Sequence, residues 1–348
     1  MVKDPRQQGK GKTRPAVNLA AVPSTTHATS SPPKLNRSNA VTDWRTDPEY
    51  LEPTIPKRGY ILPLIPYTVA MSFQTAGNPD DETVIREVVP GVTTISVPFL
   101  RFNRIKFGGR ATLVRLQSGT LAVFSPTPLT PLVKSTIASI SPSPTPISYI
   151  IAPDLEHHMN LSAWHAAYPT AHIIAPEGLA EKRAALNRSD KAVTIVPFGT
   201  VFTARDKLST KVTAEFDAEF AYEFVDAHPN KELVFVHRPS RTCIEADLLF
   251  NLPAVEQYSR SGIDPTTGWA TRLFAAMQHT RGDALWQKRM LWYLFSKRDR
   301  AGFAESAKRI NAWDFVNLVP CHGDTFVGDG KTVYEKVMEW HLQGKKKN

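Results

Sequence analysis

Short runs of β-branched and apolar residues dominate the chain just beyond residue 82. Four such runs are separated by glycines: Val84–Val89, Val92–Phe99, Ala111–Leu116 and Thr120–Phe124. Runs of this kind, bounded by glycine, predict short strands joined by tight turns. Because strands joined by short turns pair in opposite directions, we expect this part of the chain to begin an antiparallel sheet.

Further along, helical and strand patterns alternate. Helices are expected over Leu132–Ile140, Leu161–Tyr168 and Leu179–Asn187, and strands over Ala171–Ala175 and Val193–Val196, before a β-rich meander that runs to about Asp247. Alternation of strands with helices indicates an α/β fold. The meanders at both ends predict that its sheets are mixed.

Residues 264–313 have the spacing of amphipathic helices. Apolar residues recur three or four positions apart at Trp269, Leu273, Phe274 and Met277, and again at Trp286, Met290, Leu291 and Leu294. This periodicity indicates helices that pack in the core or that cover a site. A strand at Phe315–Val319 and a last helix at Lys331–Gln343 close the domain.

The N-terminal region differs in composition from the rest. Residues 1–70 contain ten of the 28 prolines, together with Ser, Thr and Asn clusters and no sustained periodicity. Such a composition is typical of disordered chain. We therefore expect a disordered, basic, Pro/Ser-rich tail over residues 1–80, one domain over 81–343, and a short basic tail over 344–348.

The net charge of +9 is concentrated at the ends of the chain. Residues 1–70 hold ten Lys/Arg against five Asp/Glu, and Lys345, Lys346 and Lys347 lie at the C-terminus, so the rest is nearly neutral. Recognition of nucleic acid depends on a sustained basic face. The domain itself is therefore not expected to bind nucleic acid, although the tails could contact phosphates or an anionic membrane weakly.

The two cysteines, Cys243 and Cys321, are too few for a disulfide framework and suit a reducing compartment. The apolar stretch Ile61–Phe73 is shorter than the roughly 20 residues of a membrane helix and contains prolines, so no transmembrane segment is expected. We expect a cytoplasmic protein. Residues 1–40 are basic and rich in Ser and Thr, which leaves a mitochondrial transit peptide as the alternative. No pattern indicates an oligomeric state.

Polar side chains follow three β-rich runs. Glu156, His157 and His158 come after Ile150–Ala152, Asp247 follows the run that starts at Glu232, and His322 follows Phe315–Val319. Side chains at the end of a buried strand project from a rigid edge, where metal ligands are held well. The alternative is a purely structural role, in which Asp154 starts a helix and the histidines cap it.

Several short motifs in one order carry a resemblance to a known family. They are Ser96-Val-Pro-Phe99, Phe107-Gly-Gly-Arg-Ala-Thr112, Glu156-His-His158, Ala175-Pro-Glu-Gly178, His237-Arg-Pro-Ser-Arg-Thr242 and Asp247-Leu-Leu-Phe-Asn251. With these motifs the chain resembles the metallo-β-lactamase superfamily, and within it a domain family of unknown function. The resemblance implies an αββα sandwich of two mixed sheets with helices outside, which binds one or two metals.

The chain departs from the superfamily's His-x-His-x-Asp-His motif. If His158 takes the last place, Pro153 and Leu155 replace the two first histidines and His157 replaces the Asp. The two replaced histidines are ligands of the first of the superfamily's two metal sites, and His228 is the only nearby candidate for the third ligand of that site. A centre with two metal ions is therefore not expected. The resemblance then implies one divalent ion, zinc, iron or manganese, bound by His158, Asp247 and His322 with help from His157.

The function implied is metal-dependent hydrolysis of a small-molecule substrate: an ester, lactone, thioester or phosphate. The candidate catalytic residues are Asp247, which could also orient a ligating His, and Glu156, which could be a general base, a further ligand or a salt-bridged residue. Arg238 and Arg241 could bind a substrate carboxylate or phosphate, or pair with nearby acids and fix a turn. The alternative function is a binding or scaffold protein that has lost catalysis.

Two further residues could be functional or structural. Cys321 could ligate a metal as a thiolate, but burial as a small apolar side chain is the reading we adopt. Gly108 and Gly109 lack the helix context of a phosphate loop and more plausibly allow a tight hairpin.

Overall fold

The computed structural model of the chain describes residues 71–72 and 78–345. The expected tails, residues 1–80 and 344–348, lie mostly outside the described residues. Two short elements nevertheless precede residue 81: strand β1 (Met71–Ser72), which pairs with β4, and helix α1 (Pro79–Glu82). Helix α1 begins at Pro79 because Asn78 accepts the Asp80 N–H as an N-cap and proline suits the first turn.

The larger of the two main sheets has seven strands in the order β10-β9-β8-β7-β6-β3-β2. Its strands are β2 (Val84–Val89), β3 (Val92–Val97), β6 (Gly109–Arg115), β7 (Leu121–Phe124), β8 (Ile147–Ile151), β9 (His172–Pro176) and β10 (Thr200–Phe202). Strands β2, β3, β6 and β7 pair antiparallel, as expected, and β7, β8, β9 and β10 pair parallel. The sheet is therefore mixed.

The second main sheet has four strands in the order β11-β12-β13-β14: β11 (Phe220–Val225), β12 (Glu232–His237), β13 (Thr242–Ile244) and β14 (Asn317–Val319). It too is mixed, because β13 and β14 pair parallel while the other pairs are antiparallel. A small third sheet consists of β1, β4 (Leu100–Arg101) and β5 (Ile105–Lys106).

Helices occupy connections between strands, and the last helix follows the last strand. They are α2 (Pro131–Ile140), α3 (Leu161–Ala167), α4 (Leu179–Ser189), α5 (Ala214–Glu219), α6 (Val255–Tyr258), α7 (Trp269–Met277), α8 (Leu285–Met290), a π-helical stretch (Leu291–Phe295), α9 (Arg300–Asn311) and α10 (Gly330–Gln343). None of the helices described is long and apolar enough to cross a membrane.

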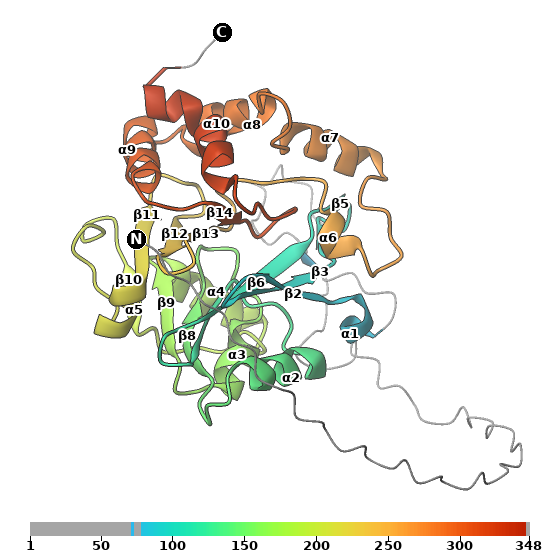
Figure 1. Ribbon diagram of the computed structural model, residues 1–348, viewed down its shortest axis with the longest axis vertical. Helices are drawn as coiled ribbons and strands as arrows, with labels where there is room; N and C mark the ends of the chain where they lie inside the picture. The colour runs from blue at the N-terminus through green and yellow to red at the C-terminus, as the bar shows by residue number, and fades with distance from the viewer. Residues whose placement is uncertain (1–70, 73–77, 346–348) are drawn as a thin grey trace, which may run out of the picture. The chain divides into compact units, whose positions relative to one another are not determined.

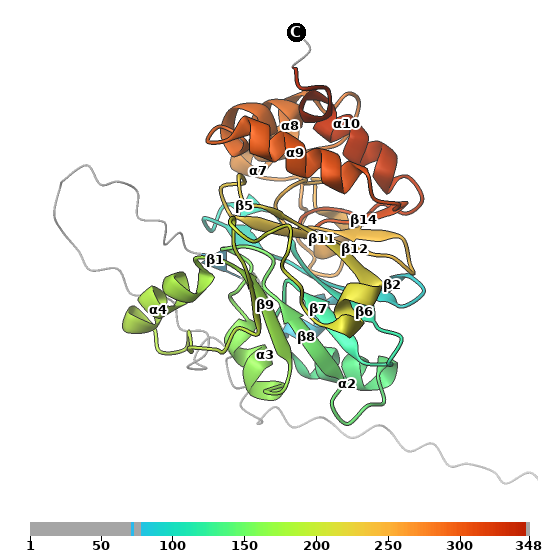
Figure 2. The same ribbon diagram turned by 90° about the vertical axis from the view of Figure 1, so that its left-hand side faces the viewer.

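Alternation of side chains along the strands builds the layers. Phe124 of β7 and Phe235 of β12 meet between the two sheets, 5.0 Å apart between ring centroids, whereas their neighbours Val123 and Val234 face outward. Val123 packs in a cluster with residues of α2 and α3, and Val234 in a cluster with residues of α9 and α10. The expected αββα sandwich of two mixed sheets is confirmed. Figure 1 and Figure 2 show α8, α9 and α10 on the outer side of one sheet and α2 and α3 on the outer side of the other.

One expected strand is wrong. The described segment Val193–Val196 forms no strand, and the edge strand β10 forms instead at Thr200–Phe202. Two carbonyls of the segment accept hydrogen bonds from side chains of α4, Val193 from Asn187 and Thr194 from Arg183, in place of strand partners. Its composition favours a strand, but these contacts decide otherwise.

The helices over residues 264–313 form as expected, with their apolar residues divided between two surroundings. Leu291 is fully buried, whereas Trp269 and Trp286 are 74% and 52% exposed. Phe274 and Met290 line a pocket that also contains the expected site. These helices thus cover a site as well as packing against the core.

Candidate metal centre

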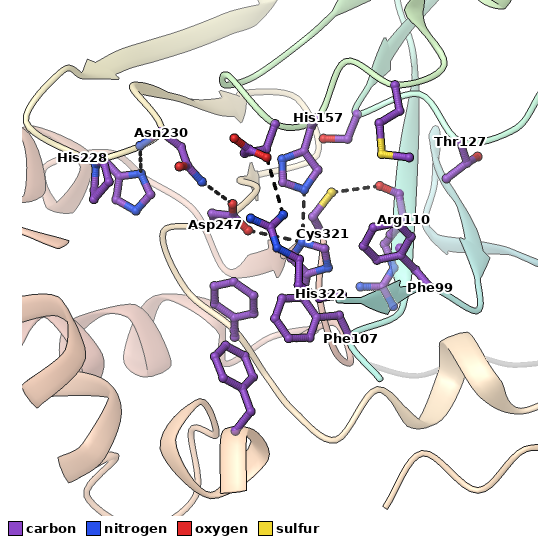
Figure 3. Close-up of a pocket in the computed structure, with 18 of the residues that line it drawn as sticks. Phe99, Phe107, Arg110, Thr127, His157, His228, Asn230, Asp247, Cys321 and His322 are labelled. Atoms are coloured by element: carbon purple, nitrogen blue, oxygen red, sulfur yellow. Dashed lines mark hydrogen bonds and ion pairs between the residues drawn. The ribbon is translucent and has the colours of Figure 1, made fainter. Parts of the chain in front are cut away.

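Three side chains from distant parts of the sequence meet at one edge of the sandwich. His157 follows β8, Asp247 follows β13 and His322 follows β14, and each offers a ligand atom within 4.8 Å of the others. Figure 3 shows the two rings and the carboxylate converging on a common point. Of the four expected ligands, the structure brings these three together.

The ring of His157 is oriented by Asp154, which is fully buried. Both carboxylate oxygens of Asp154 lie 2.9 Å from Nδ1 of His157, and one of them also accepts the backbone N–H groups of Glu156 and His157. Because a carboxylate only accepts, Nδ1 of His157 must carry the proton. Nε2, which faces the centre, is then left with its lone pair when the ring is neutral.

His322 is oriented in the same way by a backbone group. Its Nδ1 donates to the carbonyl oxygen of Gly108 at 2.7 Å, so its Nε2 also presents a lone pair to the centre when neutral. The ring stacks on Phe250, with centroids 5.1 Å apart. Gly108 has a φ of +68°, a left-handed conformation that glycine adopts without strain and that turns its carbonyl toward His322.

Asp247 supplies the third group. Its Oδ1 lies 3.2 Å from Nε2 of His322, and its Oδ2 accepts from Asn230 Nδ2 at 2.6 Å. The buried Glu232 accepts the backbone N–H of Asp247 and so fixes the chain at this point. Burial alone would raise the pKa of Asp247, but His157 and His322 outweigh it and lower that pKa, so the carboxylate is ionised.

When both rings are neutral, the centre concentrates electron pairs without hydrogen atoms between them. Nε2 of His157 lies 3.1 Å from Nε2 of His322, although neither nitrogen has a proton to donate when both rings are neutral. Burial would lower the pKa of His157, yet Asp154 and the other nearby anions hold it well above its usual value. Burial lowers the pKa of His322 although Asp247 opposes it. The arrangement calls for a cation, either a proton on His157 or a metal ion.

The turn that carries His322 is held by the fully buried Arg110 of β6. Its guanidinium donates to the carbonyls of Pro320 and Gly323, to Ser96 and to Glu256. Gln257 contacts the same turn, because it donates to Cys321 O and accepts from Gly323 N. Residues from two other segments thus set the position of the His322 ring.

The candidate centre opens into a pocket of about 270 Å³. Aromatic and apolar side chains form most of its wall, and His228, Asn230 and Thr127 add polar atoms. His228 is buried, and burial lowers its pKa to about 4, so its ring is neutral. This size and lining suit a small molecule.

His158 differs from its expected role as a ligand. Its buried ring turns toward Arg183, whose Nη1 lies 3.2 Å from Nδ1 and also donates to the His158 carbonyl. Burial, with Lys182 and Arg183, lowers the pKa of His158 to about 3. The adjacent His157 reaches the centre instead, because the turn at Asp154 directs its ring there.

Glu156 is placed in an ion-pair network. Its side chain pairs with Lys182 at 2.7 Å and with Arg101 at 3.5 Å, at the edge of the pocket. Of the three roles considered for Glu156, these contacts correspond to the salt-bridged residue.

The two candidate substrate-binding arginines, Arg238 and Arg241, lie away from the pocket. Arg238 donates to the carbonyls of Asp217 and Ala218, and Arg241 pairs with Asp314. Neither of these described residues is among those that line the pocket. They fix the turn between β12 and β13 because these neighbouring acceptors occupy their guanidinium groups.

Cys321 is buried beside His322, and its thiol donates to the Arg110 carbonyl at 3.1 Å. Its side chain is a structural one in this arrangement.

Four residues that the sequence did not single out for the site take part in its geometry: Asp154, Gly108, Arg110 and Asn230. Only Asp154 had a local signal, an acidic side chain three residues before His157, which we read as turn chemistry. The other three come from segments far from their partners in the sequence. Gly108 and Arg110 belong to the motif Phe107-Gly-Gly-Arg-Ala-Thr112, but nothing in that motif indicates contact with His322.

The chain was compared with known protein families, curated proteins and solved structures. Residues 102–261 match the model of a family described as a domain of unknown function (DUF4336). No protein of curated function matches the sequence.

Among solved structures, the chain is similar to the metallo-β-lactamase FIM-1 from Pseudomonas aeruginosa in its mono-zinc form, with 11% identity, a TM-score of 0.45, and coverage of 75% of this chain and 96% of that one. It is also similar to a metallo-β-lactamase from Hirschia baltica (9%, 0.43, 76% and 99%). The metal-soaked flavodiiron core Flv1 from Synechocystis sp. PCC6803 is similar as well (13%, 0.49, 74% and 60%). These likenesses are weak, so the architecture rests on the registers and packing of this chain itself.

Proposed function

We propose that the protein binds one divalent metal ion, zinc, iron or manganese, through His157, Asp247 and His322, and hydrolyses a small ester, lactone, thioester or phosphate. Three protein ligands of these types suit a catalytic site, because they leave a coordination position open. The proposed ligand set differs from the expected four in that His158 is left out and His157 is a full ligand.

The short contact between the two Nε2 atoms is the observation that carries the proposal. Two lone pairs 3.1 Å apart, with the Asp247 carboxylate beside them, repel one another unless a cation lies among them. The partners of the rings, Asp154 and the Gly108 carbonyl, are the kinds of acceptor that hold metal-binding histidines in the required tautomer.

A divalent ion held there would supply Lewis acidity toward a carbonyl or phosphoryl oxygen of the substrate. The chain's own side chains do the rest. Asp154 and Gly108 hold the two rings, Asn230 holds the second oxygen of Asp247, and the pocket walls exclude bulk water from the bound substrate.

Elemental analysis tests the proposal. The purified protein is dialysed against zinc, then against metal-free buffer, and its metal content is compared with that of His322→Ala, Asp247→Ala and the control His279→Ala. His279 lies outside the candidate centre. We expect about one zinc per chain for the wild type and the control and far less for the two site variants.

Thermal unfolding of each variant shows whether its fold is retained. Metal content that is low in the wild type and unchanged in the two site variants would contradict the proposal. That result would favour the binding or scaffold alternative, with a proton shared between His157 and His322.

A further inference from the structure

The wall of the pocket is unusually rich in phenylalanine. Six rings line it: Phe99, Phe102, Phe107, Phe250, Phe274 and Phe295. Phe107 stacks on Phe274 with centroids 4.6 Å apart and meets Phe250 edge-on at 5.7 Å, so the wall is closely packed. Such a surface gains free energy when it buries an apolar group and loses it when it strips water from a charged one.

The arginines that line the pocket are occupied by acceptors. Arg110 is fully buried and donates to two carbonyls, to Ser96 and to Glu256. Arg101 pairs with Glu156, which also pairs with Lys182. A phosphate site normally presents arginine or lysine groups directly to the phosphate oxygens. Here the guanidinium groups of the described wall are directed at protein acceptors.

The metal centre itself would add little positive charge. A divalent ion would be balanced by the carboxylate of Asp247 beside it and by that of Asp154 behind His157. The site is thus close to neutral when loaded. A phosphate dianion would have to give up its hydration without a net positive field in return.

Two residues that line the pocket each have a buried polar atom that makes no hydrogen bond within the described chain: Nε2 of His228 and Oγ1 of Thr127. The backbone N–H of Asn230 donates to Nδ1 of His228 at 3.3 Å. Nδ1 is therefore the acceptor, and Nε2 carries the proton of the neutral ring. In Figure 3, His228 and Thr127 stand at opposite ends of the site with the candidate metal ligands between them.

We infer that the substrate is an uncharged acyl compound with an apolar group, an ester, thioester or lactone and not a phosphate, and that Nε2–H of His228 positions it through a hydrogen bond to one of its oxygens. This inference rests on the proposed function and narrows its substrate class. A buried donor without a partner costs free energy that an acceptor on the substrate would recover. His228 is a substrate-binding residue in this scheme, because it contacts the substrate and is not one of the proposed metal ligands.

The reaction is a hydrolysis without change of oxidation state. The oxygen of water forms a bond to the acyl carbon, and the bond from that carbon to the alkoxy or thiolate group breaks. One proton of the water goes to the leaving oxygen or sulfur. The products are a carboxylic acid and an alcohol or thiol, joined in one molecule when the substrate is a lactone.

Binding to the metal-free protein separates the two substrate classes without relying on activity. Phenyl acetate and phenyl phosphate are compared by saturation-transfer NMR with chelator-treated protein. We expect a signal from phenyl acetate that weakens in Phe274→Ala, and none from phenyl phosphate. The matched control is Trp269→Ala, because Trp269 lies on the same helix but is 74% exposed and outside the pocket.

Zinc-loaded protein then tests the donor. His228→Leu removes the N–H, whereas His228→Gln keeps an N–H at about the same reach. We expect KM for phenyl acetate to rise on the order of five-fold in His228→Leu, as for loss of one neutral hydrogen bond, with recovery in His228→Gln. A role in packing alone would leave KM unchanged in both variants once thermal unfolding shows that they are folded.

The outcomes distinguish this inference from the proposed function. If the protein binds the ester but takes up no metal, the proposed metal-dependent hydrolysis is wrong, whereas the inference that the pocket binds an uncharged acyl compound is retained. Binding or hydrolysis of phenyl phosphate at least as good as that of phenyl acetate would overturn the inference while the metal site remained. Failure of the metal-free and zinc-loaded protein to bind either probe would overturn it as well.

Discussion

His157 and His322 face each other through their Nε2 atoms at 3.1 Å, and each has its other ring nitrogen committed to an acceptor. One acceptor is the carboxylate of Asp154, and the other is the carbonyl of Gly108. The two rings are thus oriented independently, from different segments, toward one point. This geometry makes the groups behind the rings as important to the centre as the rings themselves.

Asp154→Asn should weaken metal binding without removing a ligand. An amide can donate to Nδ1 of His157, which would move the ring proton to Nε2 and block the lone pair. We expect zinc affinity to fall by roughly 10- to 100-fold, measured by competition with a chromophoric chelator. The control is Asp190→Asn, because Asp190 is exposed at the end of α4. Equal zinc affinity of Asp154→Asn and the wild type would refute the role of Asp154.

Arg110→Lys should loosen the turn that carries His322. A lysine cannot reach the two carbonyls, Ser96 and Glu256 together, so buried acceptors are left unpaired. We expect a loss of about 3 kcal/mol in the free energy of unfolding and weaker zinc binding. Urea denaturation and the chelator competition measure the two effects.

The matched control for Arg110 is Arg115→Lys, because Arg115 lies on the same strand with an exposed side chain. It should change neither quantity by more than about 0.5 kcal/mol. If both variants behave alike, the clamp on the turn has no energetic role.

Gly323→Ala should be far more costly than Gly119→Ala, although both residues have left-handed backbone, with φ of +88° and +85°. A Cβ at Gly323 would lie 2.0 Å from the carbonyl oxygen of Asn251, whereas a Cβ at Gly119 meets nothing within 4 Å. We expect losses on the order of 3 kcal/mol and about 1 kcal/mol respectively, the second from backbone strain alone. Urea denaturation gives both values, and equal losses would show that the close approach relaxes easily.

Acid should destabilise the protein in part through His341 of α10. Burial, and then Arg300, lower its pKa to about 4, while Nε2 contacts Ser296 and the ring packs against Phe303. Since the folded pKa lies below the unfolded value of roughly 6.5, the neutral ring stabilises the fold above that pH, and this stability is lost as pH falls toward 4.

The corresponding experiment compares the wild type with His341→Gln in urea at pH 7 and pH 4.5. The wild type should lose roughly 2 to 3 kcal/mol more than the variant over this interval. The other buried histidines are common to both proteins and cancel in the difference. An identical loss in the two proteins would mean that His341 titrates normally.

The strands that were well predicted are those with a strong local pattern. Val84–Val89 forms as β2 over the same residues, and Thr120–Phe124 differs from β7 by one residue. The failure at Val193–Val196 arose where side chains of α4 bind the backbone carbonyls. A pattern of apolar residues cannot report such contacts.

The choice between His157 and His158 shows the same limit at the site. The two residues are adjacent and chemically identical, and the match to the superfamily's motif favoured His158, with His157 in a supporting place. The contact with Asp154 orients the ring of His157 toward the centre, whereas the ring of His158 faces Arg183. Arg238 and Arg241 were likewise chemically suitable for binding substrate, but acceptors near their own turn hold them.

The amino-acid sequence by itself determined an α/β fold with mixed sheets, the positions of most strands and the three strand ends that supply His157, Asp247 and His322, because the period of apolar residues is a local property. The αββα arrangement was implied by the family resemblance and not by this pattern. Only the tertiary structure decided which rings face the centre and what holds them. The contact between His322 and Gly108 joins residues 214 positions apart. Such a contact depends on how the sheets pack, which no local pattern contains.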